Sequence, residues 1–179
     1  RKEDFDTDQV MLTDIKIGNT CNFACVMCNP KDSSMIYNYW SKNKDNEFVQ
    51  EHLRKDPNYF EKAKFTGFKQ NAYRDYIEDV LQKNDKVKRI SLLGGEPTLD
   101  EKLFNMLYDI SDERKKKIAL NIITNGSNNL VERTKKLGCF ANVNWTISLE
   151  GVEDVQDYAR FGSNWQEVES NILEQHKYD

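Results

Sequence analysis

The sequence lacks the features that mark membrane, secreted and nucleic-acid-binding proteins. None of its apolar runs approaches the roughly 20 residues that a membrane-spanning helix needs. No secretory signal opens the chain, which predicts a reducing, cytoplasmic location. Its 26 lysines and arginines are outnumbered by 30 aspartates and glutamates, so the formal net charge is −4, whereas nucleic-acid-binding domains are usually basic. We therefore expect neither a membrane nor a nucleic acid as a partner.

Cysteine is scarce, and its distribution is uneven. Of four cysteines, Cys21, Cys25 and Cys28 lie within eight residues with the spacing C-x3-C-x2-C. Disulfide pairing within so short a segment is geometrically awkward. The fourth, Cys139, lies far away, and we expect it to be a small buried hydrophobe. Three thiolates without a fourth can hold three corners of a metal cluster and leave one open. In structural zinc sites and iron–sulfur electron carriers, protein ligands fill all four positions. A site with one open position therefore indicates a reactive centre.

The composition is that of a globular protein with its own core. Hydrophobic residues make up 38% and charged residues 31% of 179 residues, without internal repeats or low-complexity tracts. Strand-like segments at 11–17, 88–93, 118–123 and 143–149 are each followed by a glycine- or cysteine-rich stop and, in most cases, a helical pattern. This alternation predicts an α/β fold with a parallel sheet and right-handed crossovers. We expect one domain over 1–179.

Several helix starts can be read from the sequence. Thr98–Glu101 forms a capping-box pattern before an apolar stripe, and Asn129 and Asn164 begin two further helices. The last helix is predicted to turn Val168, Ile172 and Leu173 inward. Almost sixty residues, 29–87, separate the first two strands. We interpret them as the first crossover helix plus an insertion over one end of the sheet, with helices at 34–41, 47–54 and 71–82.

The stops that follow the four strands should meet in space. In parallel α/β folds the carboxyl ends of the strands lie at one edge of the sheet, where active sites form. The segments 21–28, 94–97, 124–126 and 148–151 are therefore predicted to converge.

Together, the cysteine motif after the first strand and Gly94-Gly95-Glu96-Pro97 after the second resemble the radical S-adenosylmethionine (SAM) superfamily. The resemblance implies a partial (βα) barrel, of whose six usual strand–helix units about four are present here. We therefore expect either a fragment or a barrel completed by a partner. It also implies that Cys21, Cys25 and Cys28 hold a [4Fe–4S] cluster whose fourth iron is chelated by SAM. A 5′-deoxyadenosyl radical would then abstract hydrogen from a substrate, with a flavodoxin or ferredoxin as electron donor.

The resemblance also implies residues that bind SAM. The turn at Gly94, Gly95 and Glu96 would bind the SAM amino group, since glycines let the backbone approach a ligand and Glu96 supplies an acceptor. Ser148 and Arg160, twelve residues apart, are similar to a pattern of the SPASM/twitch subgroup, in which serine and arginine grip the SAM carboxylate. The alternative for Arg160 is a surface ion pair with Glu153 or Asp157.

Three further positions follow from the same resemblance. Glu150 stands where many relatives have aspartate, and would contact the ribose or the substrate. Asn125 lies in a Thr-Asn-Gly turn that relatives place near the ribose and methionine portions of SAM, although a structural turn explains it equally well. Met27 stands where relatives carry an aromatic residue whose backbone contacts adenine.

Two other functions remain open from the sequence. One is a non-catalytic iron–sulfur electron-transfer or scaffold module. The other is a zinc-stabilised domain whose fourth ligand is His52 or His176, although solvated surface positions suit both histidines better. The resemblance to the SPASM/twitch subgroup implies a peptide or protein side chain or a small metabolite as substrate. No general acid or base stands out in the sequence. Four aromatic residues could line a substrate cavity, but helical spacing favours core positions for most of them: Phe23, Tyr37, Tyr39 and Trp40.

Overall fold

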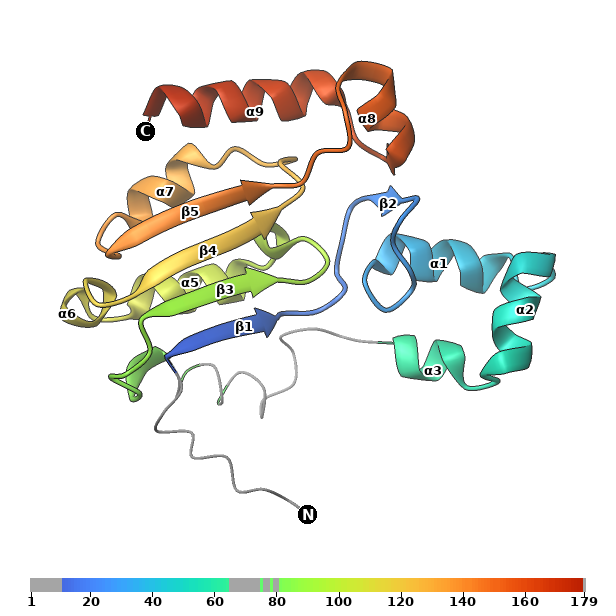
Figure 1. The fold of residues 1–179 in the computed structure, drawn as a ribbon, viewed down its shortest axis with the longest axis horizontal. Coiled ribbons are helices and arrows are strands. Elements are labelled where there is room, and N and C mark those ends of the chain that lie inside the picture. The colour runs from blue at the N-terminus through green and yellow to red at the C-terminus, as the bar shows by residue number, and fades with distance from the viewer. Residues whose placement is uncertain (1–10, 65–74, 76–77, 79–80, 179) are drawn as a thin grey trace, which may run out of the picture.

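A four-stranded parallel sheet organises the protein (Figure 1). The computed structural model describes residues 11–64, 75, 78 and 81–178. The strands are β1 (Leu12–Lys16), β3 (Arg89–Leu93), β4 (Ala119–Thr124) and β5 (Asn142–Ile147), in the order β1-β3-β4-β5. All three pairings are parallel. The four predicted strands and their parallel arrangement are thus confirmed, as expected of a partial (βα) barrel.

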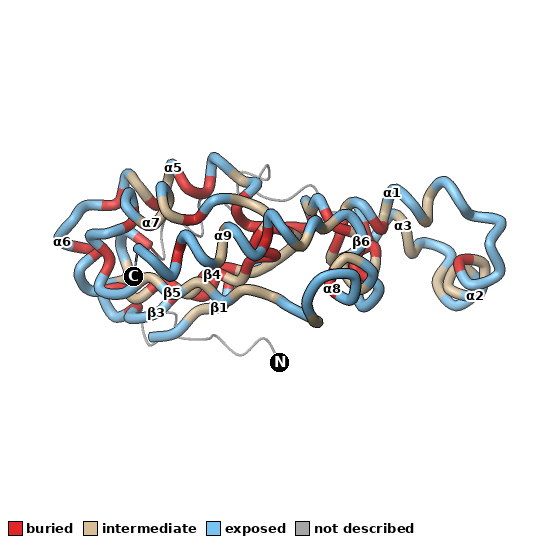
Figure 2. Tube along the Cα trace, turned by 90° about the horizontal axis from the view of Figure 1, so that it is seen from above, coloured by how far each residue is buried: buried red, intermediate tan, exposed pale blue. Residues whose placement is uncertain are grey.

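The helices that connect the strands cover one face of the sheet. Figure 2 shows α5 (Glu101–Asp109) and α7 (Val131–Leu137) on the same side of the strands. Residues buried between them and the sheet form one core, which includes Phe104, Leu107 and Leu120. Shorter elements complete this part: the 3-10 helix η3 (Pro97–Leu99), α6 (Asp112–Lys115), α8 (Glu153–Ala159) and α9 (Trp165–Tyr178).

The opposite face of the sheet carries polar side chains. Successive strand residues point to opposite faces, and the register aligns Asp14, Ser91, Asn121 and Asn144 in one row across all four strands. The described residues place no helix over this face (Figure 2). Parallel sheets are usually apolar and covered on both faces. A polar row is therefore unusual and suits a surface that faces water or a ligand.

Residues between β1 and β3 form a helical extension beyond the carboxyl ends of the strands (Figure 1). It contains α1 (Ser34–Lys42) and α2 (Glu47–Lys55), as predicted, and α3 (Tyr59–Ala63), which was not predicted. The helix predicted at 71–82 lies largely outside the described residues. The ring of Trp40 packs 5.2 Å from Phe48, 5.0 Å from His52 and 5.9 Å from Tyr59, measured between centroids. This aromatic cluster joins the three helices.

Several local predictions were wrong for identifiable reasons. The cap of α5 is Asp100, which accepts hydrogen bonds from two backbone N–H groups, because Thr98 bonds elsewhere. In α9, Val168 is buried as predicted, but Leu173 is 51% exposed and Gln175 is buried. Cys139 is exposed, since its neighbours Leu137 and Phe140 take the buried positions.

Two further side chains also differ from prediction. His52 packs among the aromatic rings instead of projecting into water. Tyr39 is 64% exposed, so it is an exception to the core positions that were expected for most of the four aromatic residues. Within the described residues, no helix combines the length and the apolar character needed to cross a bilayer.

A buried arginine joins α6 to the segment before β3. Arg114 is 8% exposed, and its burial lowers the pKa of the guanidinium. Its Nε donates to the carbonyl of Leu81 at 2.9 Å, and its Nη2 donates to the carbonyls of Val87, at 3.3 Å, and Asn84. These bonds satisfy backbone acceptors that would otherwise be buried without partners.

Substituting Arg114 with methionine is expected to lower the free energy of unfolding by about 2–4 kcal/mol, because the three carbonyls lose their donor. Urea denaturation followed by circular dichroism measures the change. Lys117→Met is the matched control, since the Lys117 side chain is 52% exposed in its pair with Glu113 and should change stability by about 0.5 kcal/mol or less. Equal effects of the two substitutions would contradict the prediction.

Candidate functional site

The three clustered cysteines lie between β1 and α1, in residues 17–33, which we call the cysteine loop. Figure 1 shows this segment beyond the carboxyl end of β1. Cys25 is buried in the short strand β2 (Ala24–Cys25), and Cys21 and Cys28 are half-buried. The Cys28 N–H donates to the Cys25 carbonyl at 3.0 Å, and the Phe23 N–H donates to Cys21 Sγ at 3.4 Å. Of the three cysteines in this loop, Cys25 is thus anchored by a strand, whereas Cys21 and Cys28 lie on either side of it.

The environment differentiates the three thiols. A hydrogen bond from the Cys28 side chain, and then the positive charge of Arg160, lower the pKa of Cys25. The same hydrogen bond raises the pKa of Cys28, and burial raises the pKa of Cys21. The surroundings of Cys25 therefore favour its thiolate, which is the form that binds metals.

Two glycines let the turn after β3 press against the cysteine loop. The Gly95 N–H donates to the Gly18 carbonyl at 2.8 Å, and the Glu96 N–H donates to the Thr20 carbonyl at 2.7 Å. A Cβ on Gly95 would lie 2.2 Å from the Thr20 carbonyl oxygen, and Gly94 has a φ of +137°. These glycines were expected to let the backbone approach a ligand. In the structure, they bring the turn into close contact with the residues that precede Cys21.

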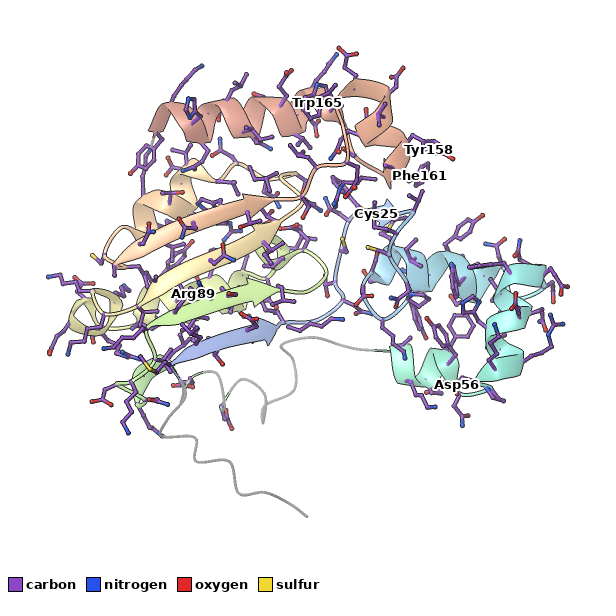
Figure 3. The ribbon with its side chains drawn as sticks, in the orientation of Figure 1. Cys25, Asp56, Arg89, Tyr158, Phe161 and Trp165 are labelled. Carbon is purple, nitrogen blue, oxygen red and sulfur yellow. The ribbon has the colours of Figure 1, made fainter. Side chains whose placement is uncertain are left out.

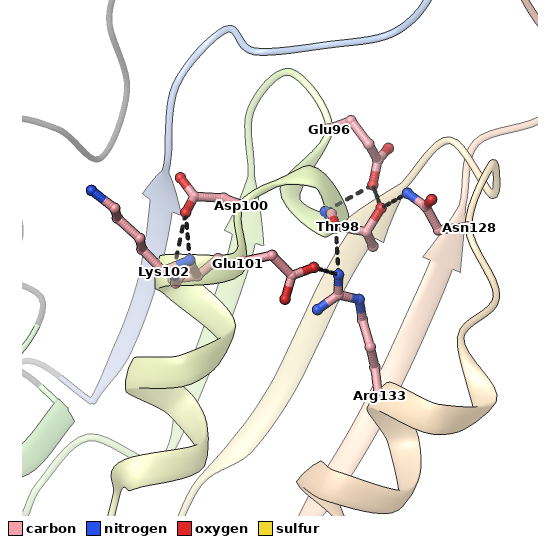
Figure 4. A network of polar contacts seen from close by, with 8 residues as sticks. Glu96, Thr98, Asp100, Glu101, Lys102, Asn128 and Arg133 are labelled. Atoms are coloured by element: carbon pink, nitrogen blue, oxygen red, sulfur yellow. Dashed lines mark hydrogen bonds and ion pairs between the residues drawn. The ribbon is translucent and has the colours of Figure 1, made fainter.

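The Glu96 carboxylate links the turns after β3 and β4. Its Oε1 accepts hydrogen bonds from Thr98 N–H at 3.0 Å, Thr98 Oγ1 at 2.6 Å and Thr124 Oγ1 at 2.7 Å. Its Oε2 accepts from Asn125 N–H at 2.6 Å. Thr98 Oγ1 accepts in turn from Asn128 (Figure 4). Because Oε1 already has three donors, an amine ligand would have to share Oε2.

Substituting Glu96 with glutamine is expected to lower the free energy of unfolding by about 2–4 kcal/mol, because an amide nitrogen must then face one of the four donors. Thermal and urea denaturation measure this loss. Glu132→Gln provides the control, since the Glu132 side chain is 70% exposed beside Lys135 and should shift stability by about 0.5 kcal/mol or less. An unchanged stability of the Glu96 variant would refute the structural role of this carboxylate.

Asn125 is placed against the cysteine loop through Asn22. Its Nδ2 donates to Asn22 Oδ1 at 2.9 Å, and Asn22 Nδ2 donates to Ser127 Oγ at 3.0 Å. Asn125 is 5% exposed. Asn22 was not predicted as a site residue, and the only sequence signal was a polar residue between two of the cysteines. This pair of amides joins the turn after β4 to the cysteine loop.

Arg160 contacts the cysteine loop as well. It lies in β6 (Arg160–Phe161), which pairs antiparallel with β2 and sets Arg160 opposite Cys25. Its Nη1 lies 3.7 Å from Cys25 Sγ, and its Nη2 donates to Glu150 Oε1 at 2.8 Å. The ion-pair partner is therefore Glu150, not the considered Glu153 or Asp157. In Figure 3, Cys25 and Phe161 lie side by side although they are far apart in the sequence.

Ser148 and Met27 lie at the borders of this arrangement. The Ser148 N–H donates to the Thr124 carbonyl at 2.9 Å, which places Ser148 beside the turn after β4. Met27 is 50% exposed and lies on the cysteine loop. The four segments that were predicted to converge therefore meet: 94–97 and 124–126 contact the cysteine loop or each other directly, and 148–151 contacts both 124 and Arg160.

The residues present fit a cluster that is bound by three cysteines and a ligand that carries a carboxylate. The described residues contain no group of three or more histidine, cysteine or acidic side chains arranged around a single ion. Ligands of a cluster bind different metal atoms, so they do not need that arrangement.

Arg160 Nε is buried and has no hydrogen-bond partner among the described residues. A carboxylate would satisfy this donor.

Comparison with known families identifies the chain's family relationship. The model described as the Radical SAM superfamily matches residues 15–178, which is nearly the whole chain. No curated protein matches the sequence.

Proposed function

Because the chain belongs to the radical SAM superfamily, we propose that it is the core of an enzyme in which Cys21, Cys25 and Cys28 hold a [4Fe–4S] cluster. The superfamily typically uses such a cluster together with SAM. The observation that carries the proposal is the placement of three thiols on one loop that is hydrogen-bonded to the turns after β3 and β4. Three cysteines leave one iron free for a further ligand.

Held by Cys21, Cys25 and Cys28, the cluster would supply, together with SAM, the radical chemistry that removes a hydrogen atom from the substrate. The chain's part is to bind, orient and exclude water. The tight contact between Gly95 and the cysteine loop holds the thiols in place, and Glu96 and Asn125 fix the neighbouring turns. Such fixed positions matter because a reactive radical must meet only its substrate.

We propose that SAM binds along the edge formed by the turns after β3, β4 and β5. Backbone atoms of Gly94 and Gly95, with Oε2 of Glu96, would receive the amino group. The buried Nε of Arg160 and the Ser148 hydroxyl would receive the carboxylate, as in the SPASM/twitch subgroup, in which we place the chain on this pair. We assign the remaining contacts to Met27 for adenine, and to Asn125 and Glu150 for the ribose.

The substrate is proposed to bind over the polar face of the sheet. The row of Asp14, Ser91, Asn121 and Asn144 offers hydroxyl, amide and carboxylate groups, which suit a peptide or a polar metabolite. Thr146 Oγ1 already donates to Asn121 Oδ1 at 2.9 Å beside this row. A low-potential donor of the flavodoxin or ferredoxin type is the proposed partner. The three reduced thiols suit a cytoplasmic compartment.

Anaerobic reconstitution with iron and sulfide tests the proposal. We expect a [4Fe–4S] signal in the electron paramagnetic resonance (EPR) spectrum of the reduced protein, a change of that signal on adding SAM, and formation of 5′-deoxyadenosine. A cluster that SAM leaves unchanged would instead support a non-catalytic iron–sulfur module. A colourless protein that binds zinc and no iron would overturn the proposal.

A further inference from the structure

Backbone pairing holds Arg160 next to one of the clustered cysteines. The register of β2 and β6 sets Cys25 opposite Arg160, and the Val26 N–H donates to the Ala159 carbonyl at 2.9 Å. The Arg160 side chain is only 12% exposed. Its position therefore depends on main-chain hydrogen bonds and burial and not on a flexible surface contact.

The guanidinium lies between a thiol and a carboxylate. Arg160 Nη1 is 3.7 Å from Cys25 Sγ, and Nη2 is 2.8 Å from Glu150 Oε1. Arginine stays protonated in proteins and donates through all of its nitrogens. The positive charge of Arg160 thus lies beside the Cys25 sulfur. The negative charge of Glu150, whose side chain is 39% exposed, lies on the other side of the guanidinium.

We propose that Arg160 and Glu150 form a charge pair that sets the reduction potential of the cluster bound through Cys25. Reduction adds one negative charge to a cluster, and hydrogen bonds to its sulfurs together with nearby positive charge favour the reduced state. Arg160 therefore raises the potential. Glu150 offsets part of that charge and lowers the potential. The partly buried position strengthens both effects, because screening by water is weaker there.

This inference rests on the proposed function, since it requires a cluster at the three cysteines. It differs from a role of Arg160 in holding the SAM carboxylate, which acts only when SAM is present. A potential measured without SAM separates the two roles. The charge pair also predicts opposite shifts for its two members, which the loss of a merely structural ion pair would not produce.

The experiment is a dithionite titration with redox mediators, followed by EPR, on the reconstituted full chain without SAM. For Arg160→Gln we expect the ratio of reduced to oxidised cluster at a fixed ambient potential to fall by about tenfold, which is about 59 mV for one electron. For Glu150→Gln we expect that ratio to rise. The matched controls are Arg54→Gln and Glu47→Gln, because these two residues form an exposed 2.7 Å ion pair on α2.

Each outcome decides one of the two proposals. Opposite shifts in the two site variants, with unshifted controls, support the charge pair. A wild-type potential in Arg160→Gln, or shifts of the same sign in both site variants, overturns it while the cluster assignment stands. If Arg160→Gln fails to load iron, the sign of the shift in Glu150→Gln decides alone. A wild-type protein that takes up no iron refutes the proposed function itself.

Discussion

Substituting Cys25 with alanine is expected to abolish the cluster. Cys25 is the most deeply buried of the three clustered thiols, and it lies in the β2–β6 pairing that fixes the loop. Without Cys25, only two cysteines remain to bind the cluster. We therefore expect the iron content after anaerobic reconstitution to fall by about tenfold or more. Iron and sulfide assays, together with the visible absorbance of the cluster, measure the loss.

Cys139→Ala is the matched control for this substitution. Cys139 is exposed and follows α7, outside the loop that carries the other three. Removing its thiol should leave the iron content unchanged, which separates a specific ligand from any accessible sulfur. If Cys25→Ala keeps its iron, or if both variants lose it equally, the three-cysteine site is not where iron binds.

Substituting Gly95 with alanine is expected to destabilise the protein strongly. The added Cβ would lie 2.2 Å from the Thr20 carbonyl oxygen and 2.6 Å from two neighbouring backbone carbons. Backbone cannot move aside as a flexible side chain can, so the turn and the cysteine loop must separate. Their hydrogen bonds of 2.8 and 2.7 Å would be lost with them. We expect the free energy of unfolding to fall by about 3 kcal/mol or more.

Denaturation curves and iron uptake together measure this effect, because the displaced loop should also load iron poorly. Gly138→Ala is the matched control. Gly138 has a φ of −58°, and a Cβ there would meet the Lys135 carbonyl oxygen at 3.3 Å, so the change should stay within about 1 kcal/mol. A Gly95 variant as stable as the Gly138 variant would show that the loop and the turn are not in close contact.

The periodic parts of the fold were predictable because local chemistry specifies them. Strands at 89–93 and 119–124 follow from dense β-branched and aliphatic residues that end at glycine or asparagine. The cap of α5 was placed at Thr98 because the pattern Thr-x-x-Glu is a capping signal. In the structure Glu96 binds that threonine, and Asp100 takes over the cap. Glu96 stands only two residues before Thr98 and caps η3, so Thr98 lies inside that short helix and cannot cap α5.

Burial was predicted less well at the borders of elements. Leu173 was expected inward from helical spacing alone, yet it is 51% exposed, whereas Gln175 is buried and its Oε1 accepts from Thr134 Oγ1 at 3.0 Å. Cys139 was expected to be buried because cysteine usually is. Which side of a short segment faces the core depends on the elements packed beside it.

By itself, the sequence determined the parallel α/β architecture, the three clustered thiols and the edge of the sheet where they lie. These depend on chain periodicity and on spacing within a few residues. Only the tertiary structure showed that Gly95 packs closely against the cysteine loop. It also showed that Glu96 joins two turns, and that Arg160 lies between Cys25 and Glu150. Those contacts join residues 10 to 135 positions apart, and folding alone decides which of these polar groups meet.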